Sequence, residues 1–482
     1  MAGSIFFYVN GKAVTASGQD AFETVANFLR YRLSATGTKL VCEEGDCGAC
    51  SVLIGRLNAA GGIEYQAVNS CIQFVYQIAG THIITVEGLR RGKDLHPVQE
   101  AMVKCHGAQC GFCTPGFVVT MSGMYETEGE MTEKRVRDAL TGNLCRCTGY
   151  EPIIKAAMSI DPAAVGTLND LYPPAEIVKA LTDYRSKSIR VESGGRTFFA
   201  PTTVDEALRF KAENPSTVIV QGATDLGVMR NKRGYEPPFV MNLSRVAELG
   251  ELTVRDNDLH VGATVTLSRL EPIMRERVPE FFEILVLFGA PQIKNAGTLA
   301  GNVANASPIA DTLPFLYVMG ARVELTSTAG SRLVDISSFY LGYKKLDLHP
   351  DEIITKIIIP LPRSGSDEIL KLYKVSKRKN LDISTMTAAF RMQLSGSVMD
   401  RVTIALGGVA PTIVRLRKTE EFLTGRQMDR ETLRQAGRIA RDEISPISDV
   451  RGSAEFRSQL TENIFSKFYF ETRHQTREEA RA

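Results

Sequence analysis

The sequence predicts an α+β protein made of several domains. The chain has 482 residues, which is more than one ordinary hydrophobic core supports, so roughly two to four domains are expected. All nine cysteines lie before residue 148, which gives the first third of the chain a chemistry of its own. Segments of strand and helix character alternate through the remainder. We therefore expect a cysteine-rich N-terminal part followed by larger α+β domains.

Composition and charge exclude several classes of partner. The chain is 44% hydrophobic and 23% charged, as in globular proteins. Its 57 Lys and Arg residues nearly balance 55 Asp and Glu residues, so we expect neither a nucleic-acid nor a membrane partner. Apolar stretches such as 281–290 are shorter than the roughly 20 residues that span a bilayer. The N-terminus has no basic segment ahead of a hydrophobic stretch, so we expect a cytoplasmic protein without a signal peptide.

The cysteine-rich part divides into two expected domains. Residues 1–90 contain short strands, turns and one helix, whereas residues 91–165 are mainly helical. The strands are expected at 5–9, 67–69 and 83–86, and the helices at 21–32, 97–104, 133–140 and 153–158. Thr114 is expected to cap a further helix whose first residue is Pro115.

The remaining two-thirds divide into a linker and two further domains. Residues 166–195 contain Pro and Gly pairs and few apolar runs, which indicates an interdomain linker. Two α+β domains are expected at 196–365 and 367–475, and a frayed tail after Glu471. Their strands are expected at 218–220, 259–261, 353–359, 372–375, 388–394 and 402–406.

The first set of cysteines has the spacing of an iron–sulfur site. Its members are Cys42, Cys47, Cys50 and Cys71. This pattern, C-x4-C-x2-C and a distant cysteine, is the plant-type [2Fe–2S] spacing. Gly45 and Gly48 allow the tight backbone that turns N–H groups toward the cluster sulfurs. The alternatives are buried thiols or zinc, but zinc loops usually contain paired C-x2-C units.

The second set forms two close pairs, each expected just before a helix. Its members are Cys110, Cys113, Cys145 and Cys147. The N-terminus of a helix offers free N–H groups and a positive dipole end, which suit thiolates and an anionic cluster. Taken alone, this set favours iron but leaves zinc as a competitor. Cys105 belongs to neither set.

The two cysteine motifs together resemble the xanthine dehydrogenase and aldehyde oxidase family of molybdenum hydroxylases. Residues 109–116 and 142–150 resemble its second iron–sulfur domain, and the first loop resembles its ferredoxin domain. The resemblance implies a β-grasp ferredoxin domain and a helical [2Fe–2S] domain whose cluster lies nearer the molybdenum. It implies that Gln109 hydrogen-bonds to the pterin of a cofactor held by a partner chain. The alternative is that the Gln109 side chain bonds only to nearby backbone groups. Cys105 would be a core thiol on the 97–104 helix.

Two loops rich in small residues suggest a flavin site. No GxGxxG follows a strand, so a Rossmann dinucleotide site is not indicated. Residues 218–227 and 297–311 instead form loops after apolar strands, where backbone N–H groups can approach a pyrophosphate. Read alone, each loop is more typical of ordinary turns than of a phosphate site.

Together the loops resemble the flavin domain of the same family, which is of the vanillyl-alcohol-oxidase type. The resemblance places the following residues at FAD: Gly222, Ala223, Thr224, Asp225, Leu226, Phe288, Thr298, Gly301, Asn302, Asp311 and Lys418. Lys418 is alternatively a solvated charge. Ala223 and Ala300 stand where many relatives have glycine, and a methyl group is tolerable there if φ is negative.

The resemblance implies an electron-transfer role for the chain. We expect two [2Fe–2S] clusters and FAD, which carry electrons from a molybdopterin cofactor on a large partner subunit to NAD⁺. The chain would be the small iron–sulfur/FAD subunit of a bacterial enzyme, in a heterotetramer of two small and two large subunits. No residue here is expected to be a catalytic acid or base.

Fusion of the iron–sulfur and flavin domains in one chain favours the xanthine dehydrogenase type of this family, which oxidises hypoxanthine and xanthine to urate. Three other readings stay open. They are a hydroxylase of aldehydes or N-heterocycles, a flavin/iron–sulfur reductase without a molybdenum partner, and a zinc-stapled interaction module. The acceptor is expected to be NAD⁺, with O₂ as the alternative.

Overall fold

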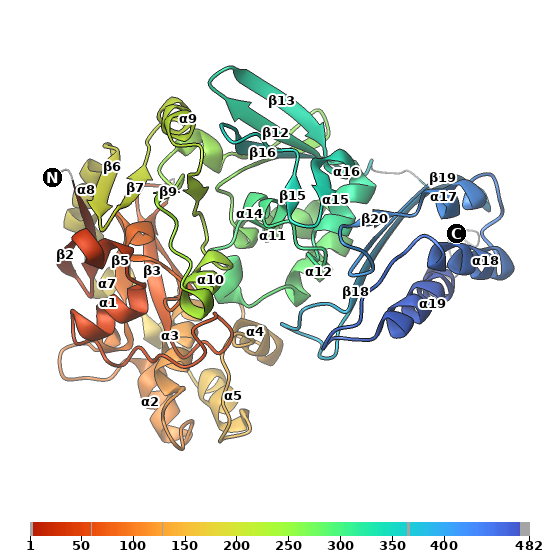
Figure 1. The fold of residues 1–482 in the computed structure, drawn as a ribbon. Coiled ribbons are helices and arrows are strands. Elements are labelled where there is room, and N and C mark those ends of the chain that lie inside the picture. Colours follow the sequence, from red (N-terminus) through yellow and green to blue (C-terminus); the bar gives the residue numbers. More distant parts are fainter. Residues whose placement is uncertain (1–2, 59, 128, 364–366, 473–482) are drawn as a thin grey trace. The chain divides into compact units, whose positions relative to one another are not determined.

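A computed structural model describes residues 3–58, 60–127, 129–363 and 367–472 (Figure 1). The chain forms two compact units. The first contains residues 1–249, 266–268 and 289–298, and the second contains residues 250–265, 269–288 and 299–482. Helices and sheets are mixed in each unit, which confirms a multidomain chain of mixed secondary structure. No helix within the described ranges is long and apolar enough to cross a membrane.

The chain begins with a five-stranded sheet in the order β2-β1-β5-β3-β4. Its elements are β1 (Ser4–Val9), β2 (Lys12–Ser17), α1 (Val25–Tyr31), β3 (Ser51–Leu57), β4 (Ile63–Asn69) and β5 (His82–Ile84). β1 and β5 run parallel, and the other neighbours are antiparallel. Ile5, Phe7 and Val9 alternate along β1 and are buried in the core, as a half-buried strand requires.

The predicted helix at 21–32 was too long at its start. Residues 18–22 form a 3₁₀ turn, and α1 starts only at Val25. The reason is Thr24, whose Oγ1 accepts the amide of Asn27 at 3.3 Å and so caps the helix.

A helical segment follows the first sheet, as predicted. Its helices are α2 (Pro97–Lys104), α3 (Thr114–Tyr125), α4 (Glu133–Ala139) and α5 (Glu151–Met158). The prediction of Thr114 as the cap of α3 was wrong by one residue. The amide of Phe117 bonds to the carbonyl of Cys113 at 3.2 Å, so Cys113 is the N-cap and Thr114 is the first helical residue.

The predicted linker at 166–195 is instead largely structured. It contains α7 (Leu168–Leu171), α8 (Pro174–Arg185) and β6 (Ile189–Ser193), and α6 (Pro162–Val165) precedes it. Ile177 and Leu181, one helical turn apart, are both buried. The hydroxyl of Tyr184 accepts the amide of Phe6 at 3.1 Å and donates to the carbonyl of Ser4 at 3.0 Å. Sequence alone missed this helix because its apolar face is only two residues wide.

The first unit ends in a four-stranded sheet in the order β6-β7-β9-β8. Its remaining elements are β7 (Arg196–Ala200), α9 (Val204–Glu213), β8 (Val218–Ile219), α10 (Leu226–Arg233) and β9 (Phe239–Met241), with α13 (Pro291–Lys294) from later in the chain. β6 pairs with β7, so this sheet starts at Ile189, ahead of the predicted boundary at 196.

Among the described residues, the second unit contains two larger sheets and one two-stranded sheet. The first has the order β10-β11-β16-β12-β13, and the predicted strands at 259–261 and 353–359 lie in β11 and β16. Its strands are β10 (Leu252–Arg255), β11 (Asp258–Gly262), β12 (Arg322–Ser327), β13 (Gly330–Asp335) and β16 (Ile353–Pro360), beside a small pair, β14 (Tyr340–Gly342) and β15 (Lys345–Leu346). The accompanying helices are α11 (Leu267–Arg277), α12 (Pro279–Leu287), α14 (Leu299–Ala304), α15 (Leu313–Met319) and α16 (Ile336–Phe339).

The last sheet, β17-β18-β19-β20, is antiparallel and carries the predicted strands of the C-terminal domain. Its strands are β17 (Glu368–Val375), β18 (Met386–Ser395), β19 (Val398–Gly407) and β20 (Val414–Arg415), followed by α17 (Arg417–Leu423), α18 (Arg430–Arg441) and α19 (Ala454–Thr472). Phe390 of the sheet stacks on Phe468 of α19 in the shared core. The predicted boundaries at 365 and 475 and the predicted tail beyond 472 lie outside the described residues.

Candidate iron–sulfur and flavin sites

The four thiols of the first set lie in contact with one another. Cys42 hydrogen-bonds to Cys47 and to Cys71, and Cys71 also bonds to Cys50. Cys50 and Cys71 are buried, whereas Cys42 and Cys47 are partly exposed. The amide of Glu44 donates to Cys42 Sγ at 3.5 Å, so backbone N–H groups turn toward the sulfurs as predicted.

These contacts divide the four thiols into acceptors and donors. The hydrogen bond from Cys47 lowers the pKa of Cys42, and the bond from Cys71 lowers the pKa of Cys50. The same bonds raise the pKa of Cys47 and of Cys71. Because thiolates are the metal ligands, the loop already stabilises part of the charge that an iron site needs.

The loop depends on glycine at two positions. Gly45 and Gly48 have φ of 82° and 67°, which confirms the predicted unusual backbone. A Cβ on Gly48 would also overlap the carbonyl oxygen of Gly142, in the second cysteine motif. The two cysteine loops therefore approach each other through their backbones.

The second set consists of two contacting pairs. The Sγ atoms of Cys147 and Cys110 lie 3.6 Å apart, and Cys113 bonds to Cys145. Burial, with that bond, raises the pKa of Cys113 to about 12. Burial acts to raise the pKa of Cys145, but hydrogen bonds with Thr148, the backbone of Cys147 and the thiol of Cys113 together lower it.

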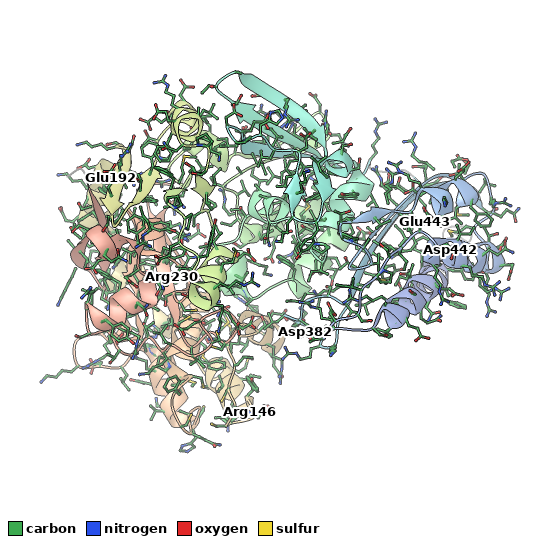
Figure 2. All side chains as sticks on the ribbon, in the orientation of Figure 1. Arg146, Glu192, Arg230, Asp382, Asp442 and Glu443 are labelled. Carbon is green, nitrogen blue, oxygen red and sulfur yellow. The ribbon has the colours of Figure 1, made fainter. Side chains whose placement is uncertain are left out.

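Exposure differs within the second set. Cys110 and Cys147 are exposed, and Cys113 and Cys145 are partly buried. Arg146, labelled in Figure 2, separates Cys145 from Cys147. Cys113 directly precedes α3, whereas Cys147 is three residues away from α5.

The sulfurs lie in an arrangement that two-iron clusters use. In a [2Fe–2S] cluster each iron takes two thiolates, so the sulfurs are expected in pairs. The pairs Cys110–Cys147 and Cys113–Cys145 match the two-iron arrangement, as does the row Cys47–Cys42–Cys71–Cys50.

Direct hydrogen bonds join the two cysteine motifs. The amide of Leu144 donates to the carbonyl of Cys47 at 3.0 Å, and the side chain of Asn143 donates to the carbonyl of Gly48 at 3.2 Å. Gln292 of α13 is 1% exposed and donates to Asn143 Oδ1 at 2.8 Å. A residue from the flavin part of the sequence thus fills the junction of the iron–sulfur motifs.

The first predicted flavin loop is closely packed in the first unit. A Cβ on Gly222 would overlap the carbonyl oxygen of Ala296, so the loops at 222–226 and 296–298 pass each other at backbone distance. Thr224 is partly buried, Asp225 is the N-cap of α10, and Leu226 packs on the core. Such crossed loops present backbone groups to a ligand without intervening side chains, which fits the pyrophosphate of FAD.

Ala223 differs from the sequence-based expectation. A methyl group was thought tolerable at negative φ, but φ of Ala223 is 55°. The residue is 5% exposed and packs in a core cluster with Val220 and Val240. Burial of the methyl group offsets the strain of the left-handed backbone. Ala300 lies within α14 and is buried.

The other predicted flavin residues lie in different settings. Thr298 is buried and pairs with Thr266 in an isolated bridge. In the second unit, Asn302 Oδ1 accepts the hydroxyl of Thr312, and Gly301 is exposed beside it on α14. Phe288 is partly buried at the end of α12.

Asp311 is a buried acid with two partners in the second unit. Its Oδ2 lies 2.6 Å from Lys374 Nζ, and their side chains are 5% and 2% exposed. Ser384 donates to its other oxygen. Burial raises the pKa of Asp311 against the opposing effect of Lys374. Sequence reasoning singled out Asp311 but missed Lys374, because nothing local marks a lysine 63 residues away.

Three further predicted residues are exposed or half-buried. Gln109 and Lys418 are exposed. The amide of Lys418 donates to Glu443, labelled in Figure 2, at 2.9 Å. Cys105 was predicted to be a core thiol. It is instead half-buried at the end of α2, and its Sγ lies 3.8 Å from the hydroxyl of Ser159.

Three domain families match successive parts of the chain. Residues 85–158 match a [2Fe-2S] binding domain family, and residues 190–362 match the FAD binding domain in molybdopterin dehydrogenase. Residues 371–472 match the CO dehydrogenase flavoprotein C-terminal domain. These matches include the second cysteine set and both predicted flavin loops.

Curated xanthine dehydrogenases are similar over nearly the whole chain. Xanthine dehydrogenase 1 of Arabidopsis thaliana is 31% identical over 97% of this chain and 39% of its own length. Xanthine dehydrogenase/oxidase of Rattus norvegicus is 29% identical over 97% of this chain and 39% of its own length. The chain thus spans about two-fifths of the length of these relatives.

Two solved structures match part of the fold. Quinoline 2-oxidoreductase from Pseudomonas putida 86 has a TM-score of 0.53 and 27% identity, over 57% of this chain and 96% of that chain. Carbon monoxide dehydrogenase from Hydrogenophaga pseudoflava has a TM-score of 0.53 and 26% identity, over 56% of this chain and 94% of that chain.

Proposed function

We propose that this chain is the electron-transfer subunit of a molybdenum hydroxylase, with two [2Fe–2S] clusters and one FAD. One observation carries the proposal: two sets of four contacting thiols are joined by the hydrogen bond from Leu144 to Cys47. When bound, the clusters supply one-electron chemistry and FAD supplies the step between one and two electrons. The proposal includes a β-grasp fold for the ferredoxin domain and a vanillyl-alcohol-oxidase-type fold for the flavin domain.

The roles of the residues follow from their positions. The eight paired cysteines hold the irons, and the crossed loops at 222–226 and 296–298 receive the FAD phosphates. In the second unit, the resemblance of the sequence to flavin domains assigns Gly301, Asn302, Asp311, Phe288 and Lys418 to FAD binding. The residues of this chain hold and orient the cofactors, and none acts as an acid or base on the substrate.

The partner would be a large chain that binds molybdopterin, in a tetramer of two small and two large subunits. Gln109 is exposed beside Cys110, so its amide is free of the core and suited to a cofactor on another chain. All nine cysteines are free thiols, which suits the reducing cytoplasm. Similarity to xanthine dehydrogenases over 97% of this chain supports xanthine as the substrate and NAD⁺ as the acceptor.

Anaerobic reduction of the native complex tests this assignment. The chain is purified with its natural partners, and xanthine is added while the visible spectrum is recorded. We expect bleaching of iron–sulfur and flavin absorbance and its recovery when NAD⁺ is added. A Cys147→Ser variant is expected to lose the bleaching of the flavin.

Other outcomes select the alternatives. Bleaching by an aldehyde or an N-heterocycle, but not by xanthine, would keep the electron-transfer role and change the substrate. Bleaching by NADH, without any molybdenum in the purified complex, would replace the proposal with a flavin/iron–sulfur reductase.

A further inference from the structure

Helix α10 connects the first flavin loop directly to the first cysteine loop. The helix starts at Leu226, immediately after residues 222–225. In its last turn, Asn231 Nδ2 donates to the carbonyls of Glu43 and Cys71 at 2.9 and 2.8 Å. Lys232 Nζ donates to the carbonyl of Cys42 at 2.6 Å. One end of α10 thus carries flavin-loop residues, and the other end holds the backbone of two proposed iron ligands.

Two glutamines that follow the cysteine loop donate hydrogen bonds to the flavin loop. Gln73 is two residues after Cys71, and its Nε2 donates to the carbonyl of Gly222 at 2.7 Å. Gln77 Nε2 donates to the carbonyl of Gln221 at 2.9 Å. The side chains that follow the last ligand of the first set therefore hold the backbone of the flavin loop.

Packing leaves little room for either loop to move alone. A Cβ on Gly227 would overlap the carbonyl oxygen of Ile72. Val228 of α10 packs on a small buried cluster that includes Cys50, Cys71 and Ile72. Displacement of α10 would therefore disturb the environment of two thiols.

We propose that Gln73, Gln77, Asn231 and Lys232 are positioning residues that couple FAD binding to the state of the first iron–sulfur cluster. The inference rests on the proposed function, because it assumes that both cofactors bind where their residues indicate. A flavin loop that is already held loses less conformational freedom when FAD binds. By linkage, whatever strengthens FAD binding in one cluster state must stabilise that cluster state by the same factor.

Lys232 adds an electrostatic part to the coupling. Its ammonium group lies at the carbonyl of Cys42 and 3.7 Å from Glu44 Oε2. A positive charge beside the cluster favours the reduced form, which carries one more negative charge. The side chain is 45% exposed, so solvent and Glu44 screen part of this effect.

Variants of the two glutamines in the assembled protein test the flavin side of the coupling. The double variant Gln73→Ala, Gln77→Ala is expected to bind FAD on the order of tenfold more weakly, because two hydrogen bonds to the loop are lost. The measurement is fluorescence titration of the FAD-depleted protein. The matched control is Gln66→Ala, which removes an amide that bonds only to Glu64 on the same sheet. Single variants serve if the double variant does not fold.

Potentiometry followed by EPR tests the cluster side. In the wild type, removal of FAD is expected to shift the midpoint potential of the first cluster, and in the double variant this shift is expected to shrink. Lys232→Ala is expected to lower that potential and Lys232→Arg to restore it. Arg233→Ala, in the same turn of α10, is the control for charge alone.

The outcomes separate this inference from the proposed function. Wild-type FAD affinity in the glutamine variants, together with a potential that is independent of FAD, would overturn the coupling and leave the cofactor assignment intact. Absence of iron or FAD from the wild-type protein would instead overturn the proposed function.

Discussion

The amide of Leu144 donates a 3.0 Å hydrogen bond to the carbonyl of Cys47. Cys47 is a proposed iron ligand, and Leu144 directly precedes another proposed ligand, Cys145. The two cysteine motifs, almost 100 residues apart, thus share a peptide-to-peptide contact. Electron transfer between the clusters would need no intervening domain movement if both clusters occupy the proposed thiols.

Replacement of Gly48 by alanine should separate the two motifs. Its φ is 67°, and a methyl group would overlap the carbonyl of Gly142. We expect Gly48→Ala to lower the free energy of unfolding by about 2–3 kcal/mol and to reduce the iron content. The measurement is urea unfolding, followed by visible absorbance. Gly61→Ala is the control, because Gly61 also has positive φ but no atom within 4 Å of a Cβ. An equal effect in both variants would show that the close approach is unimportant.

Gln292 should stabilise the junction from within. Its side chain is 1% exposed and donates to Asn143 at 2.8 Å. Gln292→Ala leaves a cavity and a buried acceptor without its donor, so we expect a loss of about 2–4 kcal/mol in unfolding free energy. Gln19→Ala, at an exposed position, should change it by less than about 0.5 kcal/mol. Similar values for the two variants would contradict a structural role for Gln292.

The Lys374–Asp311 pair should behave as a buried ion pair. Lys374→Met leaves the carboxyl of Asp311 buried without its cation, and we expect a loss of about 3–5 kcal/mol. The double variant Lys374→Met, Asp311→Leu should recover much of this loss, while FAD binding weakens if Asp311 contacts FAD as proposed. Thermal and urea unfolding of the second unit, with flavin content, are the measurements. A double variant no more stable than Lys374→Met would argue against an ion pair of this kind. Arg434→Ala, at an exposed position of α18, serves as the control.

Protonation of His82 at acid pH should lower the stability of the first sheet. The ring is fully buried, its Nε2 accepts the amide of Gly11 at 2.9 Å, and Nδ1 bonds to the hydroxyl of Tyr65 at 2.8 Å. Burial lowers the pKa of His82 to about 4, below the roughly 6.5 of an unfolded histidine. The unfolded chain therefore binds the extra proton between these values, and stability falls as the pH drops from 6.5 toward 4.

A histidine variant isolates this contribution. His82→Gln should flatten the dependence of the melting temperature on pH between 6.5 and 4.5, with an effect on the order of 3 kcal/mol at most. His106→Asn, at an exposed position two residues after the end of α2, should leave the wild-type profile unchanged. Parallel profiles for His82→Gln and wild type would refute the assignment.

Sequence alone predicted the local features of the sites well. The glycines at 45 and 48 have the positive φ that the cysteine loop requires, and most strands lie where apolar residues alternate. Such features depend on neighbouring residues, so short patterns reveal them. The structured segment at 174–185 was missed because only Ile177 and Leu181 mark its buried face.

The contacts that join the sites could not be predicted in this way. Gln292 hydrogen-bonds to Asn143, which is 149 residues away in the sequence. Gln73 hydrogen-bonds to Gly222, which is also 149 residues away. Glutamine and asparagine are common at surfaces, so no composition signal marks their buried roles. The left-handed backbone of Ala223 was also unexpected, because its methyl group is stabilised by core residues distant in sequence.

The most direct test of the account is the iron, sulfide and FAD content of the purified chain, combined with EPR after dithionite reduction. We predict about four irons, four sulfides and one FAD per chain, and two distinct EPR signals from two reduced [2Fe–2S] clusters. A colourless protein that contains zinc, or a single EPR signal with half that iron, would contradict the assignment of both thiol sets.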